Sequence, residues 1–339
     1  MTRRVLSALL TVMLACGLVA CGEKDEPGSG AATGPNERLN LLLDYLPNAD
    51  HAGIYAAIGS GEFKTAALDV RVRTPSDPSL PLKLLAAGKA DLAISYEPEL
   101  LLARAKGAKL VSIGALVQKP LTSIVSLGHK AIKQPSELAG KTVGTAGIPY
   151  QDAYLKTILA GAGVDAGKVK AINVGFTLVP TLLSKRVDAV LGMFWNVEGV
   201  QLARQHRKPE ILRVDSLGVP TYNELIIVAR EQDVRSRGQV LRRFMRALGR
   251  GHAILRGNIG AGVNPLVKAA PDLDPAVQRA QVEATLPVFF PLGGKRPFGF
   301  QDPNEWRRYA QWMADRQLIP SANVAQRAFT NEFLPGEGV

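Results

Sequence analysis

Short apolar strands alternate with helices along most of the chain, and this alternation restricts the fold more than any other feature of the sequence. One block runs from the apolar residues 39–43 to a predicted strand at 110–117, and a second runs from 123–127 to a predicted strand at 224–229. Strands that alternate with helices form mostly parallel sheets. After residue 234 the pattern is mainly helical. We therefore predict an α/β protein with two lobes, each a mostly parallel sheet flanked by helices.

The order of the blocks predicts how the chain divides between the lobes. We place lobe 1 at residues 38–122 and 229–339 and lobe 2 at residues 123–228, so that the C-terminal helices pack on lobe 1. The body of roughly 300 residues is long enough for two lobes with cores of their own. A small ligand is then expected in the cleft between the lobes, which is a favoured place for a pocket.

The first twenty residues predict export from the cytoplasm. Arg3 and Arg4 precede an almost entirely apolar run at residues 5–20. This run is too short to span a membrane comfortably and is typical of a secretion signal. The Leu-Val-Ala that precedes Cys21 resembles the lipobox of bacterial lipoproteins, in which the cysteine is lipidated and becomes the new N-terminus. Cys16 fits that pattern less well.

We therefore predict a signal peptide at residues 1–20 and a lipid anchor at Cys21, with the protein held on the extracytoplasmic face of the cell membrane. The residues that follow are rich in Gly, Pro, Ser, Glu and Asp and have no apolar period. Such a composition is typical of a flexible linker. We place this tether at residues 21–37.

Composition excludes several kinds of chemistry. Cys16 and Cys21 are the two cysteines of the chain, so the body after the signal has neither a disulfide nor a thiolate to use. The net charge of +11 could attract nucleic acid or anionic lipid. An exported lipoprotein lies beside anionic lipid in any case, so we predict no nucleic-acid partner. The arginines at 235–256 fit the solvated face of a helix.

The strongest candidate for a binding site follows the first predicted strand. Asp44, Tyr45, Asn48 and His51 lie where this strand ends and a helix begins, and ligands of open α/β sheets bind at that edge. Asn48 also suits the N-cap of the helix. The same residues could instead only cap a turn and fill the core, and the spacing does not decide between these interpretations. A solitary histidine such as His51 is more often a hydrogen-bonded wall residue than a catalyst.

Further candidates lie at other strand ends. Tyr96 and Glu97 follow a strand of lobe 1, and Tyr222, Asn223 and Glu224 lie where the chain returns from lobe 2. Lobe 2 offers Trp195, Asn196 and Glu198, together with the loop residues Gly144, Thr145 and Gly147. The amides of that loop could hold an anion at a helix N-terminus, although such glycines often serve only the turn. The other histidines have no carboxylate at metal-ligand spacing, so we predict no metal site.

Three segments together carry a resemblance to a known family. They read DYLPNADHAGIYAA, KLLAAGKADLAISYEPELL and GMFWNVEG. With the leader, they resemble the substrate-binding proteins of ABC importers that carry thiamine-pyrimidine precursors. These are relatives of sulfonate- and taurine-binding proteins and of the fungal thiamine-pyrimidine synthase. The resemblance covers residues 39–310, and the patterns D-x-x-P-N-x-x-H-x-G-x-Y and W-N-x-E-G are its specific part.

The resemblance implies a two-lobed periplasmic-binding-protein fold of type II with an aminopyrimidine ligand in the cleft. A flat ring gains from stacking between aromatic side chains, for which Tyr45 and Trp195 are the candidates. A carboxylate accepts from an exocyclic amine and from a protonated ring nitrogen, and the charge strengthens that bond. Glu198 is the first choice for this role and Asp44 the second. Asn48 and Asn196 can each donate and accept.

The expected function is that of the solute-binding component of an ABC importer. The predicted ligand-binding residues are Asp44, Tyr45, Asn48, His51, Tyr96, Glu97, Gly144, Thr145, Gly147, Trp195, Asn196, Glu198 and Tyr222. The expected partners are a membrane permease and an ATPase, and no P-loop appears in this chain. We expect a monomer with no cofactor and no catalytic residue.

Two alternatives differ from this expectation. An enzyme like the fungal synthase is expected to carry a cysteine-rich motif, and no cysteine follows Cys21. A binding protein for a sulfonate or a flavin precursor is the nearer alternative. A sulfonate calls for arginines and backbone amides, whereas the motifs here offer carboxylates and aromatic rings, which favours an amine-bearing heterocycle.

Overall fold

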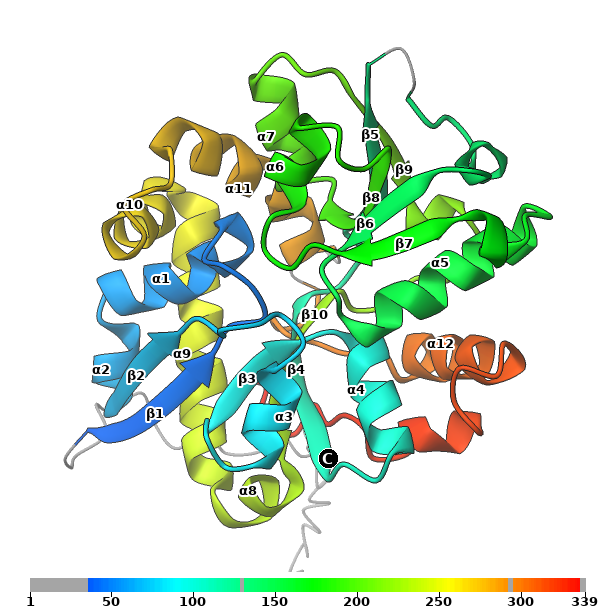
Figure 1. The fold of residues 1–339 in the computed structure, drawn as a ribbon. Helices are drawn as coiled ribbons and strands as arrows, with labels where there is room; N and C mark the ends of the chain where they lie inside the picture. Colours follow the sequence, from blue (N-terminus) through cyan, green and yellow to red (C-terminus); the bar gives the residue numbers. More distant parts are fainter. Residues whose placement is uncertain (1–35, 129–130, 292–294, 336–339) are drawn as a thin grey trace, which may run out of the picture.

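The computed structural model describes residues 36–128, 131–291 and 295–335. The predicted signal peptide, the lipid anchor at Cys21 and nearly all of the predicted tether lie outside these residues. Two five-stranded sheets form the centres of two lobes, and helices cover both sheets (Figure 1). The predicted two-lobed α/β architecture is therefore confirmed. Within the described residues, no helix combines the length and the apolar character needed to cross a membrane.

Lobe 1 is built on a sheet with the strand order β2-β1-β3-β10-β4. Its strands are β1 (Glu37–Leu42), β2 (Leu68–Arg73), β3 (Leu92–Ser95), β4 (Leu110–Val117) and β10 (Leu225–Arg230). β1 pairs in parallel with β2 and β3, whereas β10 runs antiparallel to both of its neighbours. The sheet is thus mixed, with β10 reversed among strands that otherwise share one direction.

Lobe 2 repeats this arrangement with the order β7-β6-β8-β5-β9. Its strands are β5 (Thr122–Leu127), β6 (Thr142–Thr145), β7 (Lys170–Asn173), β8 (Ala189–Phe194) and β9 (Pro209–Arg213). β6 pairs in parallel with β7 and β8, and β5 is antiparallel to β8 and β9. Here β5 is the reversed strand.

The reversed strand in each sheet is the strand that has just crossed from the other lobe. β5 starts beside the end of β8, with Thr122 opposite Phe194, and β10 starts beside the end of β4, with Leu225 opposite Val117. The chain therefore leaves and enters both sheets at the edge where the other strands end. As a consequence, the carboxyl ends of the strands in the two lobes face each other, and the loops that follow them meet between the lobes.

Helices cover the sheets and connect the lobes. The helices that follow the strands of lobe 1 are α1 (Ala52–Gly59), α2 (Glu62–Thr65), α3 (Pro81–Ala86) and α4 (Glu97–Ala105), and those of lobe 2 are α5 (Pro149–Gly161), α6 (Leu178–Leu183) and α7 (Glu198–Arg204). The C-terminal helices are α8 (Glu231–Ser236), α9 (Gly238–Gly257), α10 (Gly260–Ala269), α11 (Pro275–Phe289) and α12 (Pro303–Asp315). α11 touches α7 of lobe 2 as well as α10, so it bridges the lobes.

The mainly helical C-terminal region begins with two helices in place of one long helix. These helices, α8 and α9, meet at Arg237. The guanidinium group of Arg237 binds Asp91 and Glu37 at 2.9 and 2.8 Å. These ion pairs hold the junction between α8 and α9 against lobe 1. Near the C-terminus, the helical region ends in the 3-10 turn Ala322–Ala325.

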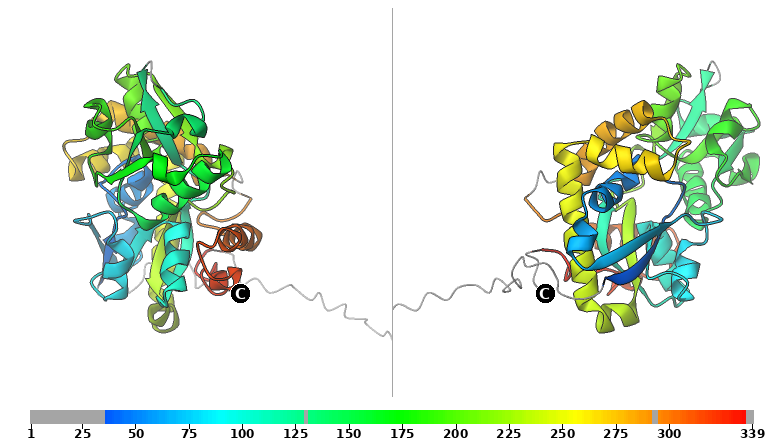
Figure 2. Two further views of the ribbon diagram at one scale, coloured as in Figure 1. Left: turned by 45° about the vertical axis from the view of Figure 1, so that its right-hand side comes forward. Right: turned by 90° about the vertical axis from the view of Figure 1, so that its left-hand side faces the viewer.

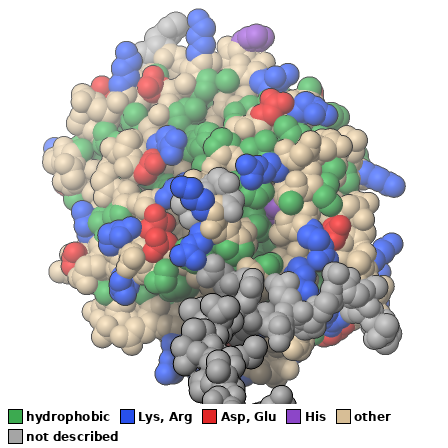
Figure 3. Space-filling model, turned by 180° about the vertical axis from the view of Figure 1, so that it is seen from behind, with side chains coloured by type: hydrophobic (Ala, Val, Ile, Leu, Met, Phe, Trp, Pro, Cys, Tyr) green, Lys and Arg blue, Asp and Glu red, His purple; other side chains and the backbone are tan. Residues whose placement is uncertain are grey.

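The arginines of α9 bind neighbouring elements, which corrects the expected solvated face. Arg243 pairs with Glu37 of β1, Arg250 with Glu62 of α2, and Arg242 donates to the Glu332 carbonyl oxygen. α9 itself packs along α1 and α2, as the side view shows (Figure 2). On the rear face of the molecule, Lys and Arg side chains are spread out with acidic side chains between them (Figure 3).

A buried carboxylate joins the two segments that connect the lobes. Glu224, on the returning segment, accepts hydrogen bonds from the backbone amides of Leu121 and Thr122 at 2.6 and 2.8 Å on the outgoing segment. It also accepts from the hydroxyl groups of Thr122 and Tyr222, both at 2.8 Å. Nearby, Glu97 accepts from the backbone and side-chain nitrogens of Asn223 at 2.8 and 2.7 Å. These bonds hold the two crossovers side by side.

The Glu224 contacts predict a graded loss of stability. Glu224→Ala removes the acceptor of four buried donors, so we expect the free energy of unfolding to fall by about 3–5 kcal/mol. Glu224→Gln retains one oxygen that can accept from the same donors, so its loss should be about 1–2 kcal/mol. Urea denaturation followed by tryptophan fluorescence measures both, with the exposed Glu283→Ala as the control. An alanine variant as stable as the control would contradict this role.

Candidate functional site

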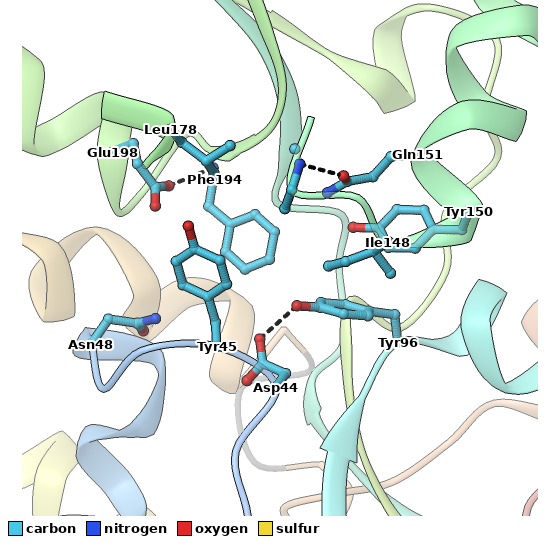
Figure 4. A pocket seen from close by; sticks show the side chains of 12 residues that line it. Asp44, Tyr45, Asn48, Tyr96, Ile148, Tyr150, Gln151, Leu178, Phe194 and Glu198 are labelled. Carbon is cyan, nitrogen blue, oxygen red and sulfur yellow. Dashed lines mark hydrogen bonds between the residues drawn. The ribbon is translucent and has the colours of Figure 1, made fainter. Parts of the chain in front are cut away.

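A pocket of about 320 Å³, partly open to solvent, lies where the strand ends of the two lobes meet (Figure 4). Lobe 1 contributes Asp44, Tyr45, Asn48 and Tyr96, and lobe 2 contributes Ala146, Ile148, Tyr150, Gln151, Leu178, Gly192, Phe194 and Glu198. Five of the residues predicted from the sequence therefore line one pocket: Asp44, Tyr45, Asn48, Tyr96 and Glu198.

Asp44 is held in place by two neighbours in lobe 1. The Tyr96 hydroxyl donates to one carboxylate oxygen at 2.7 Å, and His51 Nε2 lies 2.9 Å from the other. The backbone N–H of Asn48 donates to His51 Nδ1 at 3.2 Å, so Nδ1 carries no proton and Nε2 donates to Asp44. His51 is therefore a positioning residue. Each carboxylate oxygen has a second lone pair, which leaves Asp44 able to accept from a ligand.

The turn that carries these residues forms for local reasons. The Asn48 side chain accepts from the Asp50 backbone amide at 2.8 Å and caps the 3-10 turn Ala49–His51, which leads into α1. The capping role predicted for Asn48 is thus confirmed. The side chains of Asn48 and His51 form a reciprocal capping box in this turn, and His51 also bonds Asp44. The sequence between β1 and α1 therefore sets both the helix start and the direction of the Asp44 carboxylate.

Glu198 faces the pocket from lobe 2. It is the first residue of α7, and its carboxylate accepts from the Phe194 backbone amide at 2.8 Å. Burial and, to a smaller extent, the negative charge of Asp44 across the pocket raise the pKa of Glu198 to about 7, although hydrogen bonds from backbone amides offset part of the rise. Two carboxylates from different lobes therefore oppose each other. A ligand that donates hydrogen bonds to both relieves their repulsion and favours the closed arrangement of the lobes.

Aromatic rings form the remaining walls. Tyr45 meets Phe176 edge to face with ring centres 4.9 Å apart, and the Phe194 ring lies next to Tyr45 (Figure 4). On the other side, Tyr96 and Tyr150 pack at 5.1 Å. Burial and then the charges of Glu198 and Asp44 raise the pKa of Tyr45, so its phenol stays neutral and can donate. A flat apolar ring with polar edges suits this combination of walls.

Trp195 does not line the pocket, in contrast to the expected stacking with Tyr45. Its backbone amide donates to the Leu121 carbonyl oxygen and its indole N–H donates to the Pro120 carbonyl oxygen, both at 3.1 Å. The Arg213 guanidinium lies 4.9 Å from the centre of its ring. Trp195 thus packs against the outgoing crossover. The preceding residue, Phe194, presents the aromatic ring to the pocket instead.

Asn196 makes a contact between the lobes outside the pocket. Its side-chain nitrogen donates to Asp50 at 2.6 Å and to the Thr285 hydroxyl at 2.7 Å. All three side chains are buried. Burial raises the pKa of Asp50, which the hydrogen bond from Asn196 partly offsets. Asn196 therefore joins lobe 2 to the turn before α1 and to α11, rather than offering its amide to the pocket.

Two other predicted residues, Glu97 and Tyr222, lie in the crossover region. Glu97 and Tyr222 are buried there and bond Asn223 and Glu224 respectively. Burial raises the pKa of Glu97 to about 8, although the Asn223 amide groups lower it. Neither residue lines the pocket, so the structure gives both a part in joining the lobes.

The glycine loop after β6 does not present free amides. The Ala146 N–H donates to the Gln151 side chain at 2.9 Å, and the Gly147 N–H donates to the Thr145 hydroxyl at 3.3 Å. Gly144 lies within β6. The Tyr150 backbone amide at the start of α5 bonds the Glu99 carboxylate of lobe 1. A carboxylate thus already occupies this helix N-terminus, which disfavours the anion site considered for this loop.

The sequence did not single out several residues that line the pocket. Ile148, Tyr150, Gln151, Leu178, Gly192 and Phe194 belong to this group. Phe194 is adjacent to the predicted Trp195, and Tyr150 and Gln151 start a helix that follows a strand, which is the position that marked Asp44. Within the described ranges there is no group of three or more His, Cys, Asp and Glu side chains able to hold a metal ion.

Comparison with known proteins identifies the family. The family model described as NMT1/THI5 like matches residues 48–258. The chain is also 31% identical over 330 residues to the formylaminopyrimidine-binding protein of Halalkalibacterium halodurans, with 97% of this chain and 98% of that protein covered. The chain belongs to the NMT1/THI5-like family. A putative thiamine biosynthesis protein of Haemophilus influenzae is 34% identical over 287 residues, 84% of this chain and 89% of that one.

Other members and a solved structure show the range of the NMT1/THI5-like family and its fold. Some matching relatives are named 4-amino-5-hydroxymethyl-2-methylpyrimidine phosphate synthase. The alkanesulfonate-binding protein SsuA of Xanthomonas axonopodis pv. citri, bound to MOPS, superposes with a TM-score of 0.66 at 17% identity. The superposition covers 88% of this chain and 99% of the SsuA chain. The predicted periplasmic-binding-protein fold is thus confirmed, and this family member has a solute-binding role.

The pKa of Glu198 predicts how pH affects the stability of the ligand-free protein. An unfolded glutamate loses its proton near 4.5 and the folded Glu198 near 7, so its contribution to stability falls as pH rises through this interval. Glu198→Gln has no such loss. We therefore expect the melting temperature of the variant, relative to that of the unsubstituted protein, to rise between pH 5 and pH 8.

Thermal unfolding at several pH values measures this difference, with the exposed Glu283→Gln as the control. Glu97 and Glu99 also have raised pKa values, but they are present in both proteins and cancel in the comparison. A difference in melting temperature that does not change with pH would show that Glu198 titrates normally.

Proposed function

We propose that this protein captures an aminopyrimidine precursor of thiamine in the pocket between its lobes and delivers it to a membrane permease. The observation that supports this proposal most directly is the pair of carboxylates, Asp44 and Glu198, which face one pocket from opposite lobes. The similarity to a formylaminopyrimidine-binding protein over 97% of the chain points to the same class of ligand.

The lining residues suit the chemistry of such a ligand. The exocyclic amine and a protonated ring nitrogen donate to the carboxylates, and the charge strengthens those bonds. The faces of the ring pack against Tyr45 and Phe194. In the part of the chain that the structure describes, no Lys or Arg lines the pocket. A sulfonate would therefore place its negative charge near two carboxylates without a cation, which makes it the poorer ligand.

The proposed mechanism is closure of the lobes around the ligand. The two lobes are joined through the crossovers that Glu224 holds together, and a ligand that binds both lobes shifts the population toward the closed form. We propose that an ABC permease with its ATPase recognises that form. We also propose that a lipid on Cys21 anchors the protein, that it acts as a monomer, and that it binds its ligand without converting it.

Binding measurements test the proposed ligand class. In a thermal-shift panel, a ligand that binds only the folded protein raises its melting temperature. Aminopyrimidine thiamine precursors should do so, whereas taurine, alkanesulfonates and riboflavin should not. A shift with the sulfonates or riboflavin alone would overturn the ligand assignment while retaining the role in solute binding.

Substitutions then separate the residues of the pocket from those beside it. Glu198→Gln should weaken aminopyrimidine binding by about 1.5–3 kcal/mol because a charged hydrogen bond is lost. Phe194→Ala should weaken it by about 1–2 kcal/mol through lost ring contacts. Trp195→Ala is the matched control, since its ring faces the crossover. Titration calorimetry measures all three, and a larger loss for Trp195→Ala than for Phe194→Ala would restore the stacking role first expected for Trp195.

A further inference from the structure

A bulge in β8 places a glycine at the wall of the pocket. Along the β5–β8 pairing, Ser123 lies opposite Met193 and Ile124 lies opposite Leu191, so Gly192 between them has no partner. Its φ of +106° lies in a region that residues with a side chain rarely adopt. Bulges re-aim the chain locally and are common next to binding sites. Gly192 is therefore both the extra residue of the bulge and a lining residue of the pocket.

The space beside Gly192 is filled by the amide group of another lining residue. A Cβ atom at position 192 would lie 2.2 Å from Gln151 Nε2 and 2.8 Å from its Cδ. No side chain fits there unless Gln151 moves. Gln151 itself is buried, in the first turn of α5. The glycine and its unusual backbone thus make room for one particular side-chain amide.

The orientation of that amide is fixed by the backbone. The Ala146 N–H donates to Gln151 Oε1 at 2.9 Å. An N–H can donate only to the oxygen, so the nitrogen of the amide must be at the other position and carries two N–H donors. Figure 4 shows this nitrogen pointing toward the pocket, on the side opposite Glu198. The pocket therefore presents acceptors at one side and a fixed donor at the other.

We infer that Gln151 is a specificity residue that donates a hydrogen bond to an acceptor atom of the ligand, either a ring nitrogen or a carbonyl oxygen of a ring substituent. This inference rests on the proposed function and extends it. A ligand must carry donors for Asp44 and Glu198 at one edge and an acceptor for Gln151 at the other. A site built to hydrogen-bond a ligand group rejects an analogue without that group, because a buried polar atom is left unpaired.

The two-edged requirement narrows the class of ligand. An aromatic amine without a ring nitrogen or carbonyl satisfies the carboxylates but offers no acceptor to Gln151, whose two N–H groups then have, among the described residues, only the Tyr150 hydroxyl beside them. A sulfonate satisfies Gln151 but opposes the carboxylates. An amino-substituted nitrogen heterocycle satisfies both edges at once, and its flat ring can pack against Tyr45 and Phe194. The bulge at Gly192 thus affects which ligand binds by making room for the Gln151 amide, although glycine has no side chain to contact the ligand.

A cycle that combines protein and ligand changes tests this inference. The full chain and the variants Gln151→Met and Gln151→Glu are titrated with an aminopyrimidine precursor. They are also titrated with analogues in which one ring nitrogen is replaced by CH or the substituent carbonyl by CH₂. Gln151→Met keeps the size of the side chain and removes the donor. Gln151→Glu can still accept from Ala146 and turns the donor into an acceptor. Gln205→Glu, exposed in the same lobe, controls for the added charge.

We expect Gln151→Met to bind the parent compound about tenfold more weakly, the loss of one neutral hydrogen bond, and Gln151→Glu to bind it more weakly still. One analogue should bind the unsubstituted protein about tenfold more weakly than the parent compound does. The same analogue and the parent compound should bind Gln151→Met equally well, which identifies the atom that accepts from Gln151. Gly192→Ala should reproduce the loss, because the new methyl group displaces the Gln151 amide. Melting temperatures of the ligand-free variants check that each one folds.

The outcomes separate this inference from the proposed function. If the unsubstituted protein binds no aminopyrimidine, the proposed function fails and this inference fails with it. If it binds the parent compound and both Gln151 variants match it within about twofold, the inference alone is overturned. Equal losses for the parent compound and for every analogue would also overturn it, since Gln151 would then act only on the structure of the pocket.

Discussion

The contact between Glu224 and the outgoing crossover is the interaction on which the arrangement of the lobes depends. Its carboxylate takes two backbone amides at Leu121 and Thr122, at the point where the chain starts β5 beside the end of β8. Burying a carboxylate is costly unless donors surround it, and here four donors do so. The two crossovers consequently lie together as one connection, and the strand ends of both sheets open onto the same cleft.

The pocket exists because the two crossovers bring the lobes together. Each lobe contributes part of its lining, and neither part forms a pocket without the other. Asp44, held by His51 and Tyr96, faces Glu198 across the pocket. Neither carboxylate has a cation beside it among the lining residues, so their repulsion opposes closure until a hydrogen-bond donor enters. The Asn196–Asp50 contact shows that the lobes also meet directly outside the pocket. Under the proposed function, ligand binding acts on a balance between contacts that close the cleft and charges that open it.

Sequence reasoning located the part of the site that local structure controls. Asp44, Tyr45 and Asn48 were expected because they follow a strand and precede a helix, and Glu198 because its motif resembles that of a known family; all four line the pocket. Tyr96 was found on the same ground. Glu97 and Tyr222 satisfied the same rule yet bond within the crossovers. Position at a strand end is therefore not sufficient, because neighbouring residues at that end point in different directions.

The sequence by itself determined the two α/β lobes, because the alternation of apolar strands with helices is a local pattern. Strands joined through helices can also be arranged in only a few topologies. It also determined the capped turn from Asp44 to His51, whose bonds join residues only a few positions apart. Only the tertiary structure decided that Phe194 rather than Trp195 faces Tyr45, and that Gln151 fills the space beside Gly192. Both depend on the bulge in β8 and on how the two sets of strand ends meet, and these are set by pairing between segments far apart in the chain.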